Sequence, residues 1–185
     1  MATKNNIPNE KYGILISKMK KGNYCTKDAT KKVINYILRA EGSSNANKSD
    51  VLCQGAYGAI DFLGENFIIK QFNQVSSLNP HNRDKNRYID HQIFAFSDVS
   101  EKILEANPDL WRKTCSDMTS ILSDEQHQVA YALHKPDSDC KHLHLHFAVN
   151  TVDFHTGNKR QENWQQTAEH QKKLNAYLED NLSEY

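Results

Sequence analysis

Three histidines alternate with apolar residues in the segment 142–150, which reads His-Leu-His-Leu-His-Phe-Ala-Val-Asn. Side chains alternate between the two faces of a β-strand, so a strand here would place His142, His144 and His146 on one face and large apolar residues on the other. Neutral imidazole is the commonest metal ligand in proteins and a good general acid or base. The alternation therefore predicts a strand with one face in a hydrophobic core and a metal-binding or catalytic site on the other.

A fourth histidine, His134, ends the apolar segment Val-Ala-Tyr-Ala-Leu-His and is separated from the other three by a short turn-like stretch. An antiparallel hairpin would bring His134 close to this row. A site of three histidines leaves coordination positions open for a phosphate oxygen or an activated water. Asp137 and Asp139 lie in the turn, where they either orient a ligating imidazole or only shape the turn.

A metal site that polarises a phosphate needs a nucleophile, and the N-terminal part of the chain offers two tyrosines. Tyr36 lies in residues 26–39, whose apolar spacing predicts a helix that Thr26 can cap. Tyr36 overlaps the apolar stripe of this helix only in part, so it is either a core residue or a reactive one. Tyr24, just before the helix, is the competing candidate. A phenol is a poor nucleophile at neutral pH and needs a base or a polarised phosphate.

Length and composition narrow the class of protein. A chain of 185 residues is long enough for one domain with a real core, and we assign 1–185 to a single domain. The formal net charge is zero, which argues against an overall cationic coat for nucleic acid but not against a local basic groove. We expect a cytoplasmic protein without a membrane segment, because no run of 18 apolar residues and no signal-peptide core are present. The four cysteines are scattered and predicted to be reduced.

The remaining pattern mixes strands and helices without the strict alternation of a parallel sheet. We predict strand pieces over 12–19, 51–56, 66–71, 90–96, 128–134 and 142–152, a loop over 74–87, and helices over 26–39, 99–124 (with Pro108 as a candidate break) and 164–182. This mixture predicts an α+β fold in which helices flank a central antiparallel β-sheet of about five strands.

The tract from His134 to Asn150, followed by Thr-Val-Asp-Phe-His-Thr-Gly-Asn-Lys, resembles the third motif of plasmid mobilisation relaxases, which belong to the HUH endonuclease superfamily. The pattern is similar to that of the P-type mobilisation class: a first His, an Asp shortly after it, His-x-His, three apolar residues and Asn. Asn-Tyr-Ile-Leu-Arg-Ala-Glu-Gly around Tyr36 resembles the first motif of that class, and residues 87–97, which end at Ser97, resemble the second. The similarity spans most of the chain and implies an HUH-endonuclease-like fold.

The resemblance implies a role for each motif. Tyr36 would attack the scissile phosphate and become attached to the 5′ end of the nicked strand. Ser97 would contact DNA near that phosphate. The divalent ion, Mn²⁺ or Mg²⁺, would be bound by His134, His144 and His146.

Two features depart from the family pattern. The spacing between His134 and the histidine pair is slightly long, and a symmetric hairpin would place His142 opposite His134. The register of the following Phe-Ala-Val-Asn favours His144 and His146, with His142 as a substitute for either. Because family members usually continue well beyond this length, we expect a relaxase domain that is either complete or the N-terminal part of a longer protein.

The implied function is site- and strand-specific nicking of DNA at a transfer origin, by metal-assisted tyrosine transesterification with a 5′-phosphotyrosyl intermediate, for conjugative DNA transfer. The implied partners are hairpin and single-stranded DNA at the transfer origin, accessory relaxosome proteins and a coupling protein.

Two other functions fit part of the pattern. The histidine row also resembles the triad of histidine-triad nucleotide hydrolases, in which His144 would be the nucleophile and no metal would be needed. His134 and Tyr36 have no role in that scheme. Alternatively, a non-catalytic, metal-dependent DNA-binding module would use the basic segments 18–39 and 81–88 for phosphate contacts.

Overall fold

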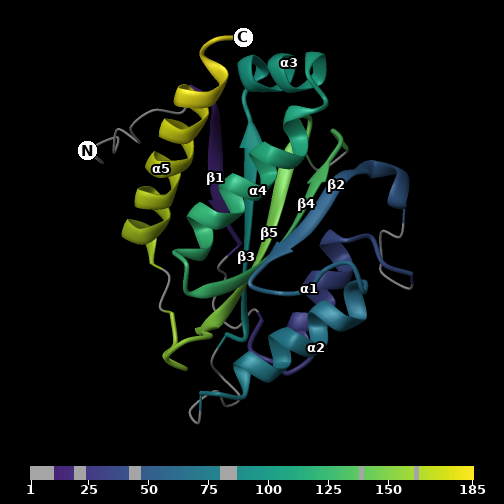
Figure 1. Ribbon diagram of the computed structural model, residues 1–185, viewed down its shortest axis with the longest axis vertical. Coiled ribbons are helices and arrows are strands. Elements are labelled where there is room, and N and C mark those ends of the chain that lie inside the picture. Colours follow the sequence, from purple (N-terminus) through teal and green to yellow (C-terminus); the bar gives the residue numbers. More distant parts are fainter. Residues whose placement is uncertain (1–10, 19–23, 42–46, 80–86, 138–139, 161–162) are drawn as a thin grey trace, which may run out of the picture.

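One antiparallel sheet of five strands, in the order β1-β3-β5-β4-β2, forms the centre of the molecule (Figure 1). The computed structural model describes residues 11–18, 24–41, 47–79, 87–137, 140–160 and 163–185. The strands are β1 (Gly13–Ser17), β2 (Val51–Tyr57), β3 (Ile89–Phe96), β4 (His127–His134) and β5 (His144–Asp153). The helices are α1 (Ala29–Ile37), η1 (Lys48–Asp50), α2 (Glu65–Ser76), α3 (Asp98–Ala106), α4 (Leu110–Ser123) and α5 (Trp164–Leu182). The expected α+β fold with a five-stranded antiparallel sheet is confirmed.

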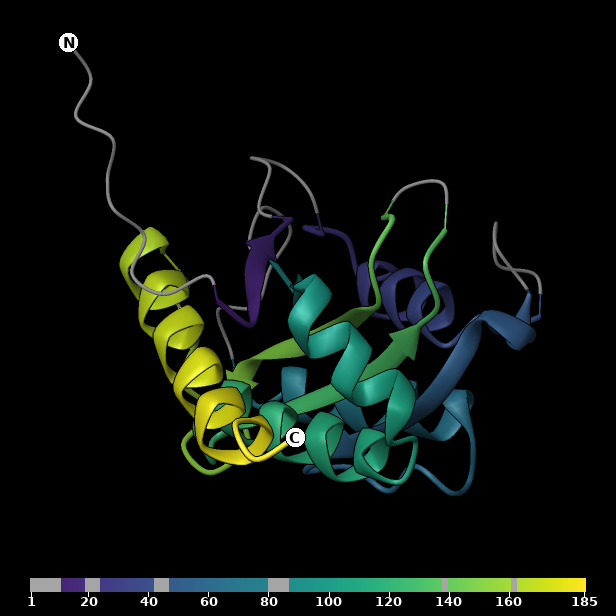
Figure 2. The ribbon, with the colours of Figure 1, turned by 90° about the horizontal axis from the view of Figure 1, so that it is seen from above.

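Helices cover the two faces of the sheet in different ways (Figure 2). On one face, α4 packs across β2 and β4, and α5 packs against β1. On the other face, α1 and α2 lie over β5. Because β5 is central, both of its faces are buried along the whole strand.

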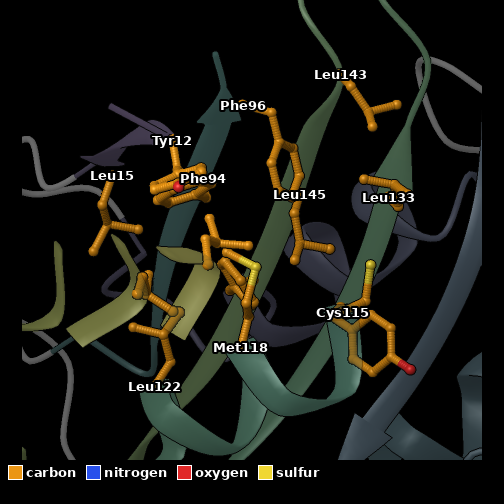
Figure 3. Packing of buried hydrophobic residues seen from close by; sticks show 14 of the residues in the cluster. Tyr12, Leu15, Phe94, Phe96, Cys115, Met118, Leu122, Leu133, Leu143 and Leu145 are labelled. Atoms are coloured by element: carbon orange, nitrogen blue, oxygen red, sulfur yellow. The ribbon is translucent and has the colours of Figure 1, made fainter. Parts of the chain in front are cut away.

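The first of these faces carries the larger hydrophobic core. Its side chains from the sheet include Phe94, Leu145 and Phe147, and they pack against Met118 and Leu122 of α4 (Figure 3). All five are fully buried. The apolar side of the predicted histidine strand therefore does what the alternation indicated: it fills a core and fixes which way the histidines must point.

The opposite face of the sheet is lined by small side chains under α1 and α2. Ala130, Ala132 and Ala148 lie there, and Ile37 and Phe72 pack onto them from the two helices. Small residues on a sheet let a helix backbone approach closely. The result is that α1, with Tyr36, is held near the histidine end of β5.

Several predicted elements are confirmed, and one is wrong. The helix predicted over 164–182 matches α5, and the break at Pro108 separates α3 from α4. Residues 66–71, predicted as a strand piece, belong instead to helix α2, which also takes the first residues of the predicted loop 74–87. Ile68, Ile69 and Phe72 share one face of α2 and are buried against α1, so helical packing decides the structure of this short apolar run. Residues 80–86 lie outside the described part of the chain.

None of the described helices is long and apolar enough to cross a bilayer.

Gly13 in β1 occupies a position with no room for a side chain. A Cβ atom there would lie 2.5 Å from the backbone oxygen of Ala95 and against the ring of Phe94. Gly13→Ala is expected to lower the free energy of unfolding by about 1–3 kcal/mol, because β1 must shift away from β3. Urea unfolding measures this, with Ile14→Ala as the control: Ile14 is 40% exposed, and its truncation should change stability by about 0.5 kcal/mol or less. Equal losses in the two variants would contradict the steric argument.

Candidate functional site

The structure brings together the three histidines that were predicted as metal ligands. His134 ends β4, and His144 and His146 begin β5, with His134 paired directly with His144 across the ladder. One ring nitrogen of each lies within 4.8 Å of those of the other two. All three side chains are buried. Three imidazoles held this close in a buried position form a preassembled site for a metal ion.

One nitrogen of each ring is held by a hydrogen bond to a backbone carbonyl or to His91, and the other nitrogen of His134, Nδ1, lies 3.3 Å from Arg39 Nη2. His134 Nε2 donates to the carbonyl of Ile37 (2.7 Å), and His144 Nδ1 donates to the carbonyl of His142 (2.9 Å). His146 Nδ1 lies 3.0 Å from His91 Nε2, while its Nε2 is buried without a hydrogen-bond partner. A buried nitrogen without a hydrogen-bond partner beside two other imidazoles suits a metal ion, and hydrogen bonds to the far nitrogen are how proteins orient metal ligands.

His142 does not belong to this site. β5 begins at His144, which pairs with His134, so the register differs by two residues from a symmetric hairpin with His142 opposite His134 and agrees with the choice of His144. His142 is exposed, and its Nδ1 lies 3.4 Å from a carboxylate oxygen of Asp98 and 3.2 Å from one of Glu101, at the start of α3. The reason lies in the connection between the strands: Leu143 joins the large core and binds Glu101 through its backbone nitrogen, which carries residues 142–143 out of the ladder.

An ion pair borders the histidines on one side. Arg39, whose side chain is almost fully buried, places Nη2 3.5 Å from Asp137 Oδ2 and 3.3 Å from His134 Nδ1. The same carboxylate oxygen lies 3.8 Å from His144 Nε2. Asp137 is therefore placed to orient a ligand or to approach an ion, and its Oδ1 also accepts from Cys140 N (2.9 Å), so it shapes the turn as well. Asp139 lies outside the described residues.

Burial keeps His134 and His146 in the form that binds metal. It lowers the pKa of His134 to about 4, and the nearby Arg39 acts in the same direction. Burial, followed by the neighbouring His134 and His91, holds the pKa of His146 well below its usual value. At neutral pH both rings are neutral, and neutral imidazole is the ligand form.

A cavity of about 350 Å³ opens on the histidines, and both candidate tyrosines line it together with Lys18 and Lys32. Tyr36 of α1 meets His146 edge-on, with ring centroids 5.7 Å apart. The hydroxyl of Tyr24 lies 3.3 Å from His91 Nδ1. The cavity thus combines candidate nucleophiles, a candidate metal site and two cationic side chains, which is the set of groups that phosphoryl chemistry requires.

Comparison with protein families identifies this arrangement. The family model described as "Relaxase: MobA/VirD2-like, nuclease domain" matches residues 24–181. The chain belongs to this relaxase family. It is therefore a DNA-nicking enzyme of a metal-dependent family, and its substrate is DNA. Comparison with curated proteins gives no match.

Two further residues of the motifs that resemble the relaxase family, Ser97 and Asn150, make hydrogen bonds that hold the fold together. Ser97 caps the N-terminus of α3, where its hydroxyl donates to the carbonyl of Lys11 (2.8 Å) and accepts from the backbone of Ser100, and it is not among the residues that line the cavity. Its contact with DNA stays a prediction. Asn150 is buried beneath α2, where it donates to Phe72 O (3.0 Å) and accepts from Ser76 (3.1 Å). It ties helix to sheet rather than facing the cavity.

Sequence reasoning assigned no role to His91. It lies on β3 two residues before Ile93, which pairs with His146, so both histidines project from the same face of the sheet. Its ring stacks on that of His146 at 5.3 Å. Pairing the predicted strand 90–96 beside the histidine strand would have revealed it, but the strand order is not readable from the sequence.

Acid is expected to destabilise the metal-free relaxase domain. Burial lowers the pKa of His91 and His134 to about 4, whereas both titrate near 6.5 in the unfolded chain. Between these values the unfolded chain binds protons that the folded chain does not. The stabilisation from these neutral histidines is therefore fully present above about pH 6.5. As the pH drops below 6.5, the free energy of unfolding decreases by at most about 1.4 kcal/mol per pH unit for each histidine.

Urea unfolding in the presence of a chelator, at pH 7 and pH 5, measures this loss. His134→Gln should flatten the dependence in part, because it removes one of several histidines whose pKa burial lowers. Ile14→Ala is the control, since Ile14 is 40% exposed and carries no titratable group, and it should leave the slope unchanged. A stability that does not differ between the two pH values would show that these imidazoles are not buried as neutral groups.

Proposed function

We propose that the relaxase domain nicks one DNA strand at a transfer origin by tyrosine transesterification, with Tyr36 as the nucleophile. The observation that carries the proposal is the position of Tyr36: it lines the same cavity as His144 and His146, and its ring lies against that of His146. Arg39 approaches the ring from another side, with its guanidinium 5.1 Å from the ring centroid.

The reaction conserves one phosphodiester bond. The Tyr36 oxygen forms a bond to the scissile phosphorus, and the bond from phosphorus to the 3′ oxygen breaks. Tyrosine loses its phenolic proton, and the departing 3′ oxygen takes up a proton to become a hydroxyl. A divalent ion, Mn²⁺ or Mg²⁺, bound by His134, His144 and His146 would supply positive charge to the phosphate. The 5′ phosphate stays on Tyr36, and the retained ester energy lets a later attack reverse the step.

Tyr24 is less suited to attack than Tyr36. Burial, followed by the proximity of Tyr36, raises the pKa of Tyr24, so its phenolate is harder to form. Its hydroxyl also lies within hydrogen-bonding distance of His91. Tyr36 is therefore the nucleophile in this proposal, in agreement with the position of the family's first motif.

The proposed substrate is single-stranded DNA next to a hairpin at the transfer origin. Lys18 and Lys32 at the cavity would contact backbone phosphates, and Ser97 would contact the strand further along β3. Conjugative transfer would also involve accessory relaxosome proteins and a coupling protein. Nicking of plasmid DNA would place the reaction in the cytoplasm.

A covalent-adduct assay tests the proposal. The protein is incubated with single-stranded oligonucleotides from its own plasmid or element and Mn²⁺, then separated on a denaturing gel. A slower band that a chelator abolishes is the expected result. Turnover of nucleoside phosphoramidates without any adduct would instead support the histidine-triad hydrolase with His144 as nucleophile, which the family match does not favour.

A further inference from the structure

A chain of three side chains, all of which line the cavity, leads from the candidate metal ligand His146 to Tyr24. His146 Nδ1 lies 3.0 Å from His91 Nε2, and His91 Nδ1 lies 3.3 Å from the hydroxyl of Tyr24. His91 is 6% exposed and His146 is 2% exposed, so water does not compete for the bond between the two rings. Each member comes from a different part of the fold: β5, β3 and the segment before α1.

The direction of each hydrogen bond in this chain follows from the first. A metal ion needs a bare nitrogen, and the buried, partnerless Nε2 of His146 is the candidate. The proton of that neutral ring then sits on Nδ1, which donates to His91 Nε2. The neutral ring of His91 in turn carries its proton on Nδ1 and donates to the Tyr24 oxygen. Tyr24 is left with its own O–H free to donate to another acceptor.

That remaining donor belongs to a side chain that lines the cavity. Tyr24 shares the cavity with Lys18, Lys32 and Tyr36, so an anion held between the two lysines would meet the hydroxyl. The backbone of Tyr24 has a φ of 61°, a left-handed conformation that residues with side chains rarely adopt, and Tyr88 N donates to its carbonyl (2.8 Å). Strain of this kind concentrates at positions where the side chain must be placed accurately.

We propose that Tyr24 donates a hydrogen bond to a non-bridging oxygen of the scissile phosphate, and that His91 is the positioning residue that orients both Tyr24 and the metal ligand His146. The assignment of the bound group as a scissile phosphate rests on the proposed function. It makes Tyr24 a second catalytic residue beside Tyr36 rather than a competitor for the nucleophilic role. One hydrogen-bond chain then couples the geometry of the metal site to the placement of the substrate.

Single-turnover cleavage separates the roles of the two tyrosines. Tyr24→Phe should still form the DNA adduct on Tyr36, but about tenfold to hundredfold more slowly, because one donor to the developing charge is lost. Its affinity for Mn²⁺, measured without DNA by calorimetry, should be unchanged. Tyr57→Phe, a half-buried tyrosine of β2 that does not line the cavity, is the matched control and should cleave at the wild-type rate. An unchanged rate in Tyr24→Phe, or complete loss of its adduct, would overturn the proposal.

Metal binding tests His91 independently of catalysis. His91→Phe removes the acceptor for His146 Nδ1 and should weaken Mn²⁺ binding about tenfold to hundredfold. His91→Gln, whose amide oxygen can accept the same bond, should recover most of the affinity. Equal Mn²⁺ affinity in the wild type and His91→Phe would refute the positioning role.

Nitrogen NMR of the wild-type protein loaded with diamagnetic Zn²⁺ reads the proton positions directly and needs no variant to fold. Protonation of both His146 and His91 at Nδ1 is expected, and a proton on His91 Nε2 would contradict the proposed direction. Failure of the nicking proposal would be distinguishable, because it would leave the calorimetric and NMR results in place while no oligonucleotide gave an adduct.

Discussion

Tyr36→Phe is expected to abolish the covalent DNA adduct, with the rate of strand cleavage falling more than about a thousandfold. The variant removes only the attacking oxygen. The phenyl ring can keep its edge-on contact with His146, and Lys18 and Lys32 remain at the cavity, so the affinity for an uncleaved oligonucleotide should stay within about twofold. Denaturing gels measure the adduct, and mass spectrometry of the digested wild-type adduct locates the modified tyrosine.

The controls for this experiment distinguish loss of the nucleophile from loss of the fold. Tyr57→Phe removes a hydroxyl from β2 away from the cavity and should retain the adduct. Tyr24→Phe should retain it at a reduced rate. An adduct that survives in Tyr36→Phe and disappears in Tyr24→Phe would identify Tyr24 as the nucleophile and contradict the role proposed for Tyr36.

The histidine strand shows how far the sequence alone could lead. Strict alternation over residues 142–150 predicted that one face would be apolar and the other would carry imidazoles. Leu145 and Phe147 are in the core, and His144 and His146 face the cavity. Alternation is informative here because β5 is buried on both faces. A shift of the strand register by one residue would turn the imidazoles into the hydrophobic core under α4. The end of the strand was less predictable. His142 continues the alternation in the sequence, but its hydrogen bond to Glu101 of α3 and the burial of Leu143 take it out of the ladder.

Residues whose role depends on tertiary contacts were beyond sequence reasoning. The run Asn-Phe-Ile-Ile-Lys-Gln at 66–71 fits either a short strand or a helix by its own pattern, and only packing of Ile68 and Phe72 onto α1 decides for α2. Arg39 is almost fully buried and forms an ion pair with Asp137, which is about a hundred positions away in the sequence. His91 lies beside His146 only because β3, like β4, is a direct neighbour of β5 in the sheet.

His146→Ala is expected to abolish high-affinity metal binding and, with it, nicking. The Nε2 atom of His146 is buried without a hydrogen-bond partner and is a candidate ligand atom. Removing this side chain leaves only two imidazoles to bind the ion. We expect Mn²⁺ affinity to fall by at least about a hundredfold, since changes one shell further out already weaken metal sites tenfold to hundredfold. Isothermal calorimetry on metal-free protein measures the affinity, and thermal unfolding checks that the variant is folded.

His142→Ala is the matched control for this experiment because it removes a histidine from the same sequence row but not from the site. Its ring lies with Asp98 and Glu101 at the start of α3, so Mn²⁺ affinity and nicking should both be retained. Loss of Mn²⁺ binding in His142→Ala, with retention in His146→Ala, would exchange the two residues in the ligand set.

The same titrations should rank the ions. Imidazole suits Mn²⁺ better than Mg²⁺, which prefers oxygen ligands, so a site built from His134, His144 and His146 should bind Mn²⁺ more tightly. Tighter binding of Mg²⁺ would indicate that the carboxylate of Asp137, rather than the three imidazoles, dominates the coordination.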